Sequence, residues 1–425
     1  MAFHIPRGTA DILPEEVTLW QYVEEKVRDI CRRYAYAEIR TPIFEHTELF
    51  QRGVGETTDI VEKEMYTFTD KGGRSITLRP EGTAAVVRSY VENKMHANPW
   101  QPTKLFYMGP MFRYERPQAG RLRQFTQFGV EAIGSDNPAI DAEVIAMAMQ
   151  FYAELGLKDL RLEMNSVGCE RCRPQHREAL VAFLENVKDQ LAPEDRQRLA
   201  RNPLRVLDSK DPKTKQLTEG APSILDHLCP DCADHFEQVQ HYLRELGVSF
   251  VVNSRLVRGL DYYTQTAFEI MEEGIGAVGT ICGGGRYNGL VREIGGKDQP
   301  GIGFALSIER LLLALKTQNV DLPVQDKLDC YLVGLGEAAR RKNAVLAARF
   351  RSAGIRVDLD YLGRGMKGQL KAADRLQATY TIIIGEDELN NNTALIKHMS
   401  SGTQEEVALD KLLETIKSRI AKEDM

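Results

Sequence analysis

The chain has 425 residues, and its 55 lysines and arginines against 61 aspartates and glutamates give a formal net charge of −6. Hydrophobic residues make up 43% of it and charged residues 27%, which is typical of globular proteins and excludes collagen, a coiled-coil rod and global disorder. At about 150 residues per domain, this length predicts two or three domains. A mildly acidic chain is not a nonspecific nucleic-acid binder, although it can carry a basic patch.

The first half of the chain predicts alternating helices and strands. Residues 14–34 have one apolar face at helical spacing and predict a helix. Residues 37–44 predict a short strand, which Pro42 places at a sheet edge where another subunit could meet it. Further strands are expected at 75–83, 105–115 and 122–131, and helices after residue 83 and at 141–155.

Residues 166–248 are helical and charged, and the strand pattern resumes at Phe250, which indicates a helical insertion in a β-rich domain. Strands are expected up to Gly303, then a very apolar helix at 304–315 and a linker at 317–327. Strands at 330–335, 355–359 and 380–384 alternate with helices at 338–352, 365–376 and 407–420. This order predicts a small α/β domain with a mostly parallel sheet. We expect domains at 1–325 and 326–425.

Arginines among apolar residues form the densest signal. Arg113, Arg121 and Arg123 flank a Pro/Gly turn, and strand alternation should place the last two on one face. Guanidiniums on one face repel unless an anion lies among them, and each can bind two phosphate oxygens at once. Arg310, in the predicted apolar helix, likewise favours an anionic ligand over a local pair with Glu309. A solvated hairpin whose arginines pair with acids is an equally good interpretation of the first segment alone.

Residues 258–263 read Arg-Gly-Leu-Asp-Tyr-Tyr, and alone they would be interpreted as a surface loop. Gln127 and Glu131 lie four residues apart on a predicted strand and so share a face, where an acid and an amide beside arginines suit a zwitterionic amino acid. Residues 274–279 match G-x-G-x-x-G, but no helix opens there, so a Rossmann site is rejected. Glycine-rich residues 283–289 are expected to approach a ligand closely or to make a tight turn.

Two Cys-x-x-Cys pairs could form a tetrahedral thiolate zinc site from Cys169, Cys172, Cys229 and Cys232. Their separation exceeds the usual ribbon spacing of about 15–20 residues, and three nearby histidines offer other ligands. Four free thiols remain an equal alternative. In the last domain basic side chains outnumber acidic ones and could meet a phosphate backbone, although solvated helix faces are the commoner explanation.

The chain has seven cysteines, an odd number, and residues 1–8 show no secretory pattern, which together predict a reduced cytoplasmic protein. It has no run of about 18–20 apolar residues, so no membrane span is expected.

These segments, in this order, resemble the bacterial histidyl-tRNA synthetases. Residues 37–45 are similar to motif 1 of class II synthetases, a dimer-interface element; residues 112–131 are similar to motif 2, and residues 301–315 to motif 3. Residues 256–263 and 283–290 are similar to the two histidine-specific peptides of the family. The peptide at 258–263 is the specific part, because motifs 2 and 3 alone would indicate only class II.

The resemblance implies an α+β catalytic domain, with an antiparallel sheet flanked by helices and a helical insertion, followed by a C-terminal α/β anticodon-binding domain. It implies a homodimer that uses L-histidine, ATP, Mg²⁺ and tRNA(His). The histidine carboxylate attacks the α-phosphate of ATP and pyrophosphate leaves; the terminal ribose hydroxyl of the tRNA then attacks the adenylate and AMP leaves. Zinc is not implied by the family and rests only on the cysteines.

The resemblance also implies roles for individual residues. Arg113 bridges the carboxylate and the α-phosphate, and Arg258 approaches the α-phosphate from the other side. The outer phosphates and adenine are held by Arg121, Arg310 and Phe125. The histidine site comprises Glu81, Gly82, Thr83 and Gln127 around the α-ammonium, Glu131 and Tyr263 at the imidazole nitrogens, and Tyr262 and Tyr287 closing the pocket. Residues 117–120 reach the acceptor end of the tRNA.

Three other functions compete with this one. A regulatory paralogue would bind histidine and activate ATP phosphoribosyltransferase without charging tRNA, but it would lose the motif arginines and the anticodon domain. A class II synthetase for proline or threonine is disfavoured by residues 258–263 and Glu131. An unrelated NTP-binding hydrolase would not need the basic last domain.

Overall fold

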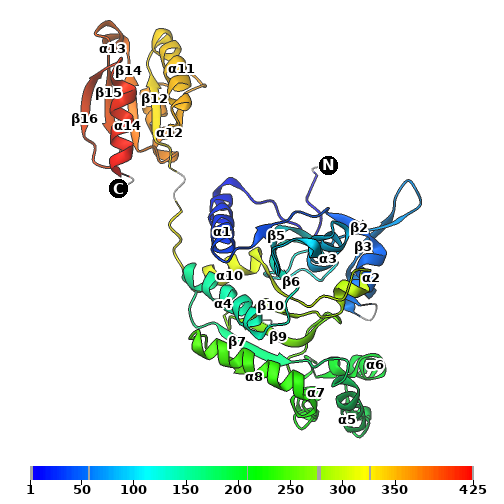
Figure 1. Ribbon diagram of the computed structural model, residues 1–425. Helices are drawn as coiled ribbons and strands as arrows, with labels where there is room; N and C mark the ends of the chain where they lie inside the picture. The colour runs from blue at the N-terminus through cyan, green and yellow to red at the C-terminus, as the bar shows by residue number, and fades with distance from the viewer. Residues whose placement is uncertain (1–2, 56–57, 208, 275–278, 325–326, 424–425) are drawn as a thin grey trace. The chain divides into compact units, whose positions relative to one another are not determined.

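The computed structural model describes residues 3–55, 58–207, 209–274, 279–324 and 327–423. The chain forms two compact units, Met1–Leu322 and Pro323–Met425 (Figure 1). Within the described residues, none of the helices is long and apolar enough to cross a lipid bilayer.

An eight-stranded sheet is the centre of the first unit. Its strand order is β1-β5-β6-β11-β10-β9-β7-β8, and its strands are β1 (Ala37–Glu38), β5 (Thr103–Phe112), β6 (Gln124–Ile133), β7 (Arg161–Ser166), β8 (Val251–Val252), β9 (Thr264–Met271), β10 (Thr280–Arg286) and β11 (Gly301–Ser307). The six inner strands pair antiparallel, whereas the outermost pairs, β1 with β5 and β7 with β8, are parallel. A separate small sheet has the order β2-β4-β3 and contains β2 (Phe44–His46), β3 (Tyr66–Thr69) and β4 (Ser75–Leu78).

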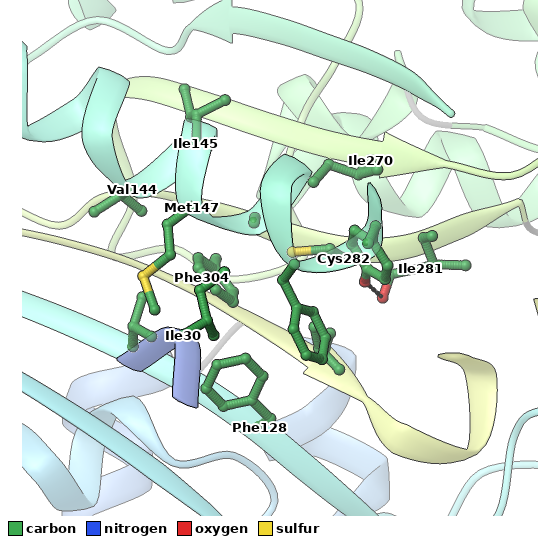
Figure 2. Packing of buried hydrophobic residues seen from close by; sticks show 14 of the residues in the cluster. Ile30, Phe128, Val144, Ile145, Met147, Ile270, Ile281, Cys282 and Phe304 are labelled. Atoms are coloured by element: carbon green, nitrogen blue, oxygen red, sulfur yellow. Dashed lines mark hydrogen bonds between the residues drawn. The ribbon is translucent and has the colours of Figure 1, made fainter. Parts of the chain in front are cut away.

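Four helices cover one face of the large sheet and form the main hydrophobic core with it: α1 (Pro14–Arg33), α4 (Pro138–Glu154), α8 (Pro230–Glu245) and α10 (Ile308–Thr317). Figure 2 shows Ile30 of α1 and Met147 of α4 packed beside Phe128 of β6 and Phe304 of β11. Because strand residues alternate, the neighbours of Phe128 and Phe304 point to the opposite face. That face lies beside α2 (Thr47–Val54), α3 (Thr83–Glu92) and the short α9 (Leu290–Glu293).

A buried charge cluster ties three elements of this unit together. Arg286 of β10 and Asp141 of α4 are both fully buried, and Nε of Arg286 lies 2.9 and 3.0 Å from the two carboxylate oxygens of Asp141. His235 of α8 places Nε2 3.1 Å from Asp141 Oδ1. Arg286 also donates hydrogen bonds to the carbonyls of Ser135 and Asn137. A buried pair of opposite charges with its other donors satisfied fixes the positions of the elements that carry it.

The predicted helical segment lies between β7 and β8. It contains α5 (Arg173–Glu185), α6 (Pro193–Arg201) and α7 (Pro212–Leu217), which Figure 1 shows grouped beside α8. Its leucines form a small core of their own, while α8 packs into the main core through Phe236, Val239 and Leu243. Short turns complete the unit: a π turn, η1 (Ile60–Glu64), and the 3₁₀ turns η2 (Met95–Ala97), η3 (Lys188–Gln190), η4 (Pro203–Val206) and η5 (Ile224–His227).

The second unit is a five-stranded sheet with helices. The strand order is β13-β12-β14-β15-β16, with β12 (Cys330–Gly334), β13 (Val357–Leu359), β14 (Tyr380–Ile384), β15 (Thr393–His398) and β16 (Gln404–Ala408). Its helices are α11 (Glu337–Ser352), α12 (Met366–Arg375), α13 (Glu386–Asn390) and α14 (Leu412–Glu423). Strand β12 pairs parallel with β13 and with β14, whereas β15 pairs antiparallel with β14 and with β16. The prediction of a mostly parallel sheet is therefore wrong for the part of the sheet that contains β15 and β16.

Three other predictions need correction. Strand β5 ends at Phe112 and strand β6 begins at Gln124. Residues 113–123 therefore form a loop rather than the ends of the two strands. The helix expected at 304–315 begins only at Ile308, because residues 301–307 are a strand held between β6 and β10. Residues 407 and 408 belong to β16, and the last helix begins at Leu412. The glycine pattern at 274–279 lies mostly outside the described residues.

Candidate active site

The candidate pocket is lined by side chains of the large sheet, of the loop between β5 and β6, and of the first turns of α3 and α10. The pocket encloses about 350 Å³, a size suited to a small-molecule ligand. It is lined by every predicted pocket residue except Gly82: Glu81, Thr83, Arg113, Arg121, Phe125, Gln127, Glu131, Arg258, Tyr262, Tyr263, Tyr287 and Arg310. Side chains from five separate stretches of the sequence therefore meet in one cavity.

The pleat of the sheet explains why two of these side chains are neighbours. Gln127 and Glu131 of β6 alternate with Phe128 and Val130, which lie in the main core. Gly303 of β11 pairs with Glu131, and a Cβ atom at Gly303 would collide with the carboxylate of Glu131. The glycine is therefore required here because it leaves room for the glutamate.

Glu131 is buried at the deep end of the pocket. Its Oε1 accepts a hydrogen bond of 2.7 Å from the hydroxyl of Thr83. Its Oε2 and the hydroxyl of Tyr287 are buried and make no hydrogen bond of good geometry with the residues that the structure describes, although Tyr287 lies near enough to act against the rise in the pKa of Glu131. Burial raises the pKa of Glu131 to about 8. The deep end thus offers unpaired polar atoms to a ligand that can donate and accept hydrogen bonds.

Glu81 and Gln127 lie where α3 begins. The carboxylate of Glu81 accepts backbone hydrogen bonds of 2.8 and 2.9 Å from the first residues of that helix, Thr83 and Ala84, and burial raises its pKa. Oε1 of Gln127 accepts from the backbone N–H of Gly82 at 3.0 Å and from the hydroxyl of Tyr107 at 3.1 Å. Gly82 therefore orients Gln127 rather than lining the pocket itself.

Two arginines of the loop between β5 and β6 share one acidic neighbour. Arg113 donates from Nε to the carbonyl of Pro80 at 2.8 Å, and its Nη1 lies 3.8 Å from Glu115. Arg121 Nη1 lies 3.3 Å from the other oxygen of Glu115. The guanidinium carbon of Arg113 is 5.4 Å from the centre of the Phe125 ring. One glutamate between two guanidiniums leaves an excess of positive charge at this end.

Arg310 adds a third guanidinium to that end of the pocket. It lies in the first turn of α10, and burial together with the charge of Arg121 lowers its pKa. The lowered pKa means that the charged form of Arg310 is disfavoured in the absence of an anion. A polyphosphate between these guanidiniums would remove that penalty.

Arg258 reaches the pocket from the opposite side. It forms an ion pair with Glu269 of β9, whose other oxygen accepts a hydrogen bond of 2.8 Å from Thr280. Burial acts to lower the pKa of Arg258, but the charge of Glu269 outweighs it and raises the pKa. A Cβ atom at Gly283 of β10 would collide with the Arg258 guanidinium. The glycine-rich strand thus makes room for an arginine of this chain.

Some pocket residues were missed by the sequence analysis, and one prediction was wrong. Lys210 enters the lining from the insertion, where nothing in its polar surroundings singles it out, and Glu115 and Glu269 line the pocket as partners of the arginines. Arg123, expected beside Arg121, does not belong to the lining; its guanidinium carbon lies 3.7 Å from the centre of the Tyr114 ring. Strand alternation does not apply because both arginines lie in the loop.

The four cysteines form a separate cluster that does not line this pocket. Their sulfur atoms all lie within 4.8 Å of one another. The histidines considered as alternative ligands have other partners: His235 bonds Asp141, His176 bonds the carbonyl of Pro222, and His227 bonds the carbonyl of Ser223. Among the residues that the structure describes, these four cysteines are the group brought close enough together to hold a metal ion.

Comparison with known proteins gives the family. A family model described as histidyl-tRNA synthetase matches residues 8–311, and one described as an anticodon-binding domain matches residues 329–419. The chain belongs to the histidyl-tRNA synthetase family. The histidine–tRNA ligase of Anoxybacillus flavithermus is 60% identical over 419 residues, which cover 98% of this chain and 99% of that protein. The histidine–tRNA ligase of Geobacillus thermodenitrificans is 59% identical over 426 residues and matches along the whole of both chains.

Solved structures agree with this assignment to the histidyl-tRNA synthetases. The apo histidyl-tRNA synthetase of Staphylococcus aureus superposes with a TM-score of 0.84 at 49% identity, and the match covers 98% of this chain and 100% of that one. The predicted class II catalytic fold and the predicted anticodon-binding domain are both confirmed. The family match argues against a synthetase for proline or threonine and against an unrelated hydrolase.

Proposed function

We propose that the pocket forms histidyl-adenylate from L-histidine and ATP and then transfers the histidyl group to tRNA(His). As a histidyl-tRNA synthetase, the protein uses ATP to join histidine to its tRNA. The observation that carries the residue assignment is the convergence of Arg113, Arg258 and Arg310 in one cavity that also holds Glu81 and Glu131.

Adenylate formation requires a carboxylate to approach a polyanion. Cations that are already in position cancel the repulsion and stabilise the charge that builds up at the α-phosphorus. We assign Arg113 to the bridge between the carboxylate and the α-phosphate and Arg258 to the opposite side of that phosphorus. Arg121 and Arg310 then hold the outer phosphates, and Phe125 stacks on adenine. Pyrophosphate leaves with the electron pair of the bond that breaks.

Mg²⁺ would share the neutralisation of the outer phosphates. The acidic side chains nearest to these arginines, Glu115 and Glu269, offer the carboxylate oxygens that Mg²⁺ accepts, and the ion ordinarily binds through one or two such groups plus phosphates. The four cysteines do not line this pocket, so the reaction gives them no part in the chemistry.

Selection of histidine would occur at the deep end of the pocket. Glu81, Thr83 and Gln127 hold the α-ammonium, and Glu131 and Tyr263 bind the two imidazole nitrogens beneath Tyr262 and Tyr287. A site whose buried polar groups need these partners rejects analogues that lack them by about 10⁴ or more. Apolar amino acids of similar size should therefore be excluded without a separate editing step.

Transfer to the tRNA would involve both units. Residues 117–120 of the loop between β5 and β6 would meet the acceptor end. In the second unit, exposed basic side chains on and near α11 and α12 would contact phosphates of the anticodon arm, and they include Arg340, Arg341, Arg349, Arg351, Arg356, Arg364, Lys367, Lys371 and Arg375. We further propose a cytoplasmic homodimer that pairs through residues 37–45, where Ile43 and Phe44 are exposed apolar side chains. Sedimentation of the intact protein tests the dimer.

Amino-acid-dependent exchange of pyrophosphate into ATP tests the assignment, with all twenty amino acids assayed singly. Exchange with histidine alone is the expected result. Absence of exchange with every amino acid, together with tight binding of histidine, would instead identify a regulatory relative that binds histidine without activating it. The presence of the four pocket arginines and of a full second unit favours the enzyme.

A further inference from the structure

We propose that Cys169, Cys172, Cys229 and Cys232 bind one zinc ion that clamps the two ends of the helical insertion together beside the histidine pocket. These cysteines lie in two short segments, residues 167–172 and 228–232, which we call the neck of the insertion. The first segment follows β7, where the chain leaves the large sheet, and the second leads into α8, where it returns to the main core.

The distances between the sulfur atoms suit a tetrahedral metal. Four sulfurs bonded to one zinc at about 2.3 Å lie about 3.8 Å from one another. Sγ of Cys169 is 3.6 Å from Sγ of Cys172 and 3.9 Å from Sγ of Cys229, and all four sulfurs fall within 4.8 Å. A disulfide would need a separation of about 2.05 Å, so the arrangement is that of metal ligands rather than of bonded pairs.

The backbone of the neck is shaped around the sulfurs. The backbone N–H groups of Cys172 and Arg173 both donate to the carbonyl of Cys169, at 3.0 and 3.1 Å, which turns the first Cys-x-x-Cys pair tightly. The backbone N–H of Cys229 donates to the sulfur of Cys172 at 3.1 Å and so joins the two Cys-x-x-Cys segments. Gly168 has a φ of +66° and leaves Cys172 room that a side chain would take. Such support orients the ligands of metal sites.

The neck is joined to the histidine-specific peptide. The backbones of Val167 and Gly168 pair with Gln265 of β9 at 2.7 and 2.9 Å. Arg173, the residue after Cys172, donates from Nε to the carbonyl of Val167 at 3.1 Å and from Nη2 to the carbonyl of Tyr263. Tyr263 lines the pocket. A metal that fixes Cys172 therefore also fixes the side chain that holds Tyr263, and Arg173 is a positioning residue for histidine.

The metal is tested first, on the intact protein purified in reducing buffer without chelator. Elemental analysis should find about one zinc per chain, and the double variant Cys169→Ser/Cys229→Ser should retain less than about a tenth of it. Cys31→Ala, which changes a buried cysteine of the main core outside the cluster, is the matched control and should keep the full complement. If the double variant does not fold, uptake of cobalt(II) by stripped wild-type protein replaces it, and the absorption spectrum of a tetrahedral thiolate site is expected.

Two results would overturn the zinc site: wild-type protein that neither contains zinc nor takes it up from solution, or a double variant with an undiminished zinc content. Because these readouts are metal contents and spectra, they do not depend on the catalytic activity. Failure of the proposed function would appear separately, as absence of histidine-dependent exchange in wild-type protein.

The link to the pocket rests on the proposed function and is tested by Arg173→Met. This variant keeps all four cysteines but removes the hydrogen bonds of Arg173 to the carbonyls of Val167 and Tyr263. It should bind zinc normally and raise the KM for histidine about tenfold, with a change of less than about twofold in the KM for ATP, because only the histidine side of the pocket loses its support. Zinc removal from wild-type protein should produce the same selective rise. An unchanged KM for histidine in both samples would refute the link.

Discussion

Glu131 illustrates how a single position combines burial with function. Between its ordinary pKa of 4.5 and its raised value of about 8, the folded protein keeps a proton that the unfolded chain has released. The folded state therefore binds more protons in this range, and the free energy of unfolding of the unliganded protein falls as the pH rises through it. Burial of Glu81 acts in the same direction.

Urea unfolding measured from about pH 5 to pH 9 tests this linkage. Both tryptophans, Trp20 and Trp100, lie in the first unit, so their fluorescence reports on that unit alone. The loss of stability with rising pH should be clearly smaller in Glu131→Gln than in wild type, because glutamine does not titrate. Parallel pH profiles for the two proteins would show that Glu131 does not hold its proton in the folded state.

A second residue-scale prediction concerns Gly283. In Gly283→Ala the new methyl group meets the end of the Arg258 side chain, which is flexible and can move away. Stability should change little, but adenylate formation should slow by about 10–100-fold because a displaced guanidinium no longer faces the phosphate. Pre-steady-state measurement of adenylate formation gives the rate. A variant with wild-type rate would mean that the position of Arg258 is not critical.

At the scale of elements, removing one member of the buried cluster of Arg286, Asp141 and His235 is expected to be costly, because a charge is left buried without its partner. Asp141→Ala leaves the Arg286 guanidinium buried without its counter-charge and should lower the free energy of unfolding by about 3–5 kcal/mol. Glu154 lies at the end of α4, the helix that also carries Asp141, and forms a partly exposed ion pair with Arg33. Glu154→Ala removes this pair and should lower the free energy of unfolding by less than about 1 kcal/mol. Urea unfolding followed by tryptophan fluorescence measures both variants. Equal losses in the free energy of unfolding would show that the buried cluster matters no more than the exposed pair.

Elements with a clear period were predictable from the sequence, and their ends were not. The apolar stripe of α1 and the helix–strand alternation from β12 to β14 match the prediction closely. Residues 301–307 were expected partly as helix because a short apolar run fits a buried strand and a buried helix equally well. Strand β16 was missed because it is a short, polar edge strand without alternation, whereas β15 was missed although its buried residues alternate.

At the scale of the whole molecule, the two units are expected to serve different steps. Lys367 and Lys371 lie one turn apart on α12 and are both exposed. The double variant Lys367→Ala/Lys371→Ala should raise the KM for tRNA about tenfold and lower the salt dependence of binding, while histidine-dependent exchange stays unchanged. Lys411→Ala/Lys417→Ala, which removes two exposed lysines at and near α14, is the matched control. Loss of exchange in the first variant would contradict this division.

Convergence in space is the property that residue patterns could not supply. The sequence singled out the arginine-rich loop, the Arg258 peptide and Arg310 separately, and each alone had an ordinary structural explanation. Only pairing of β6, β11, β10 and β9 in that order brings the three together, and such long-range strand order has no local signature. The resemblance to a family supplied what the periodicity lacked.

The rate of adenylate formation in Arg258→Ala is the most direct test of that convergence. Single-turnover measurement with saturating histidine and ATP should show a loss of about 10²–10³, because a positioned charge at the phosphorus is missing, whereas equilibrium binding of histidine should weaken far less. Arg123→Ala, in the same unit but outside the pocket lining, should retain nearly the full rate. Equal losses of rate and of histidine binding in Arg258→Ala would show that this arginine serves binding alone, contrary to the role assigned to it.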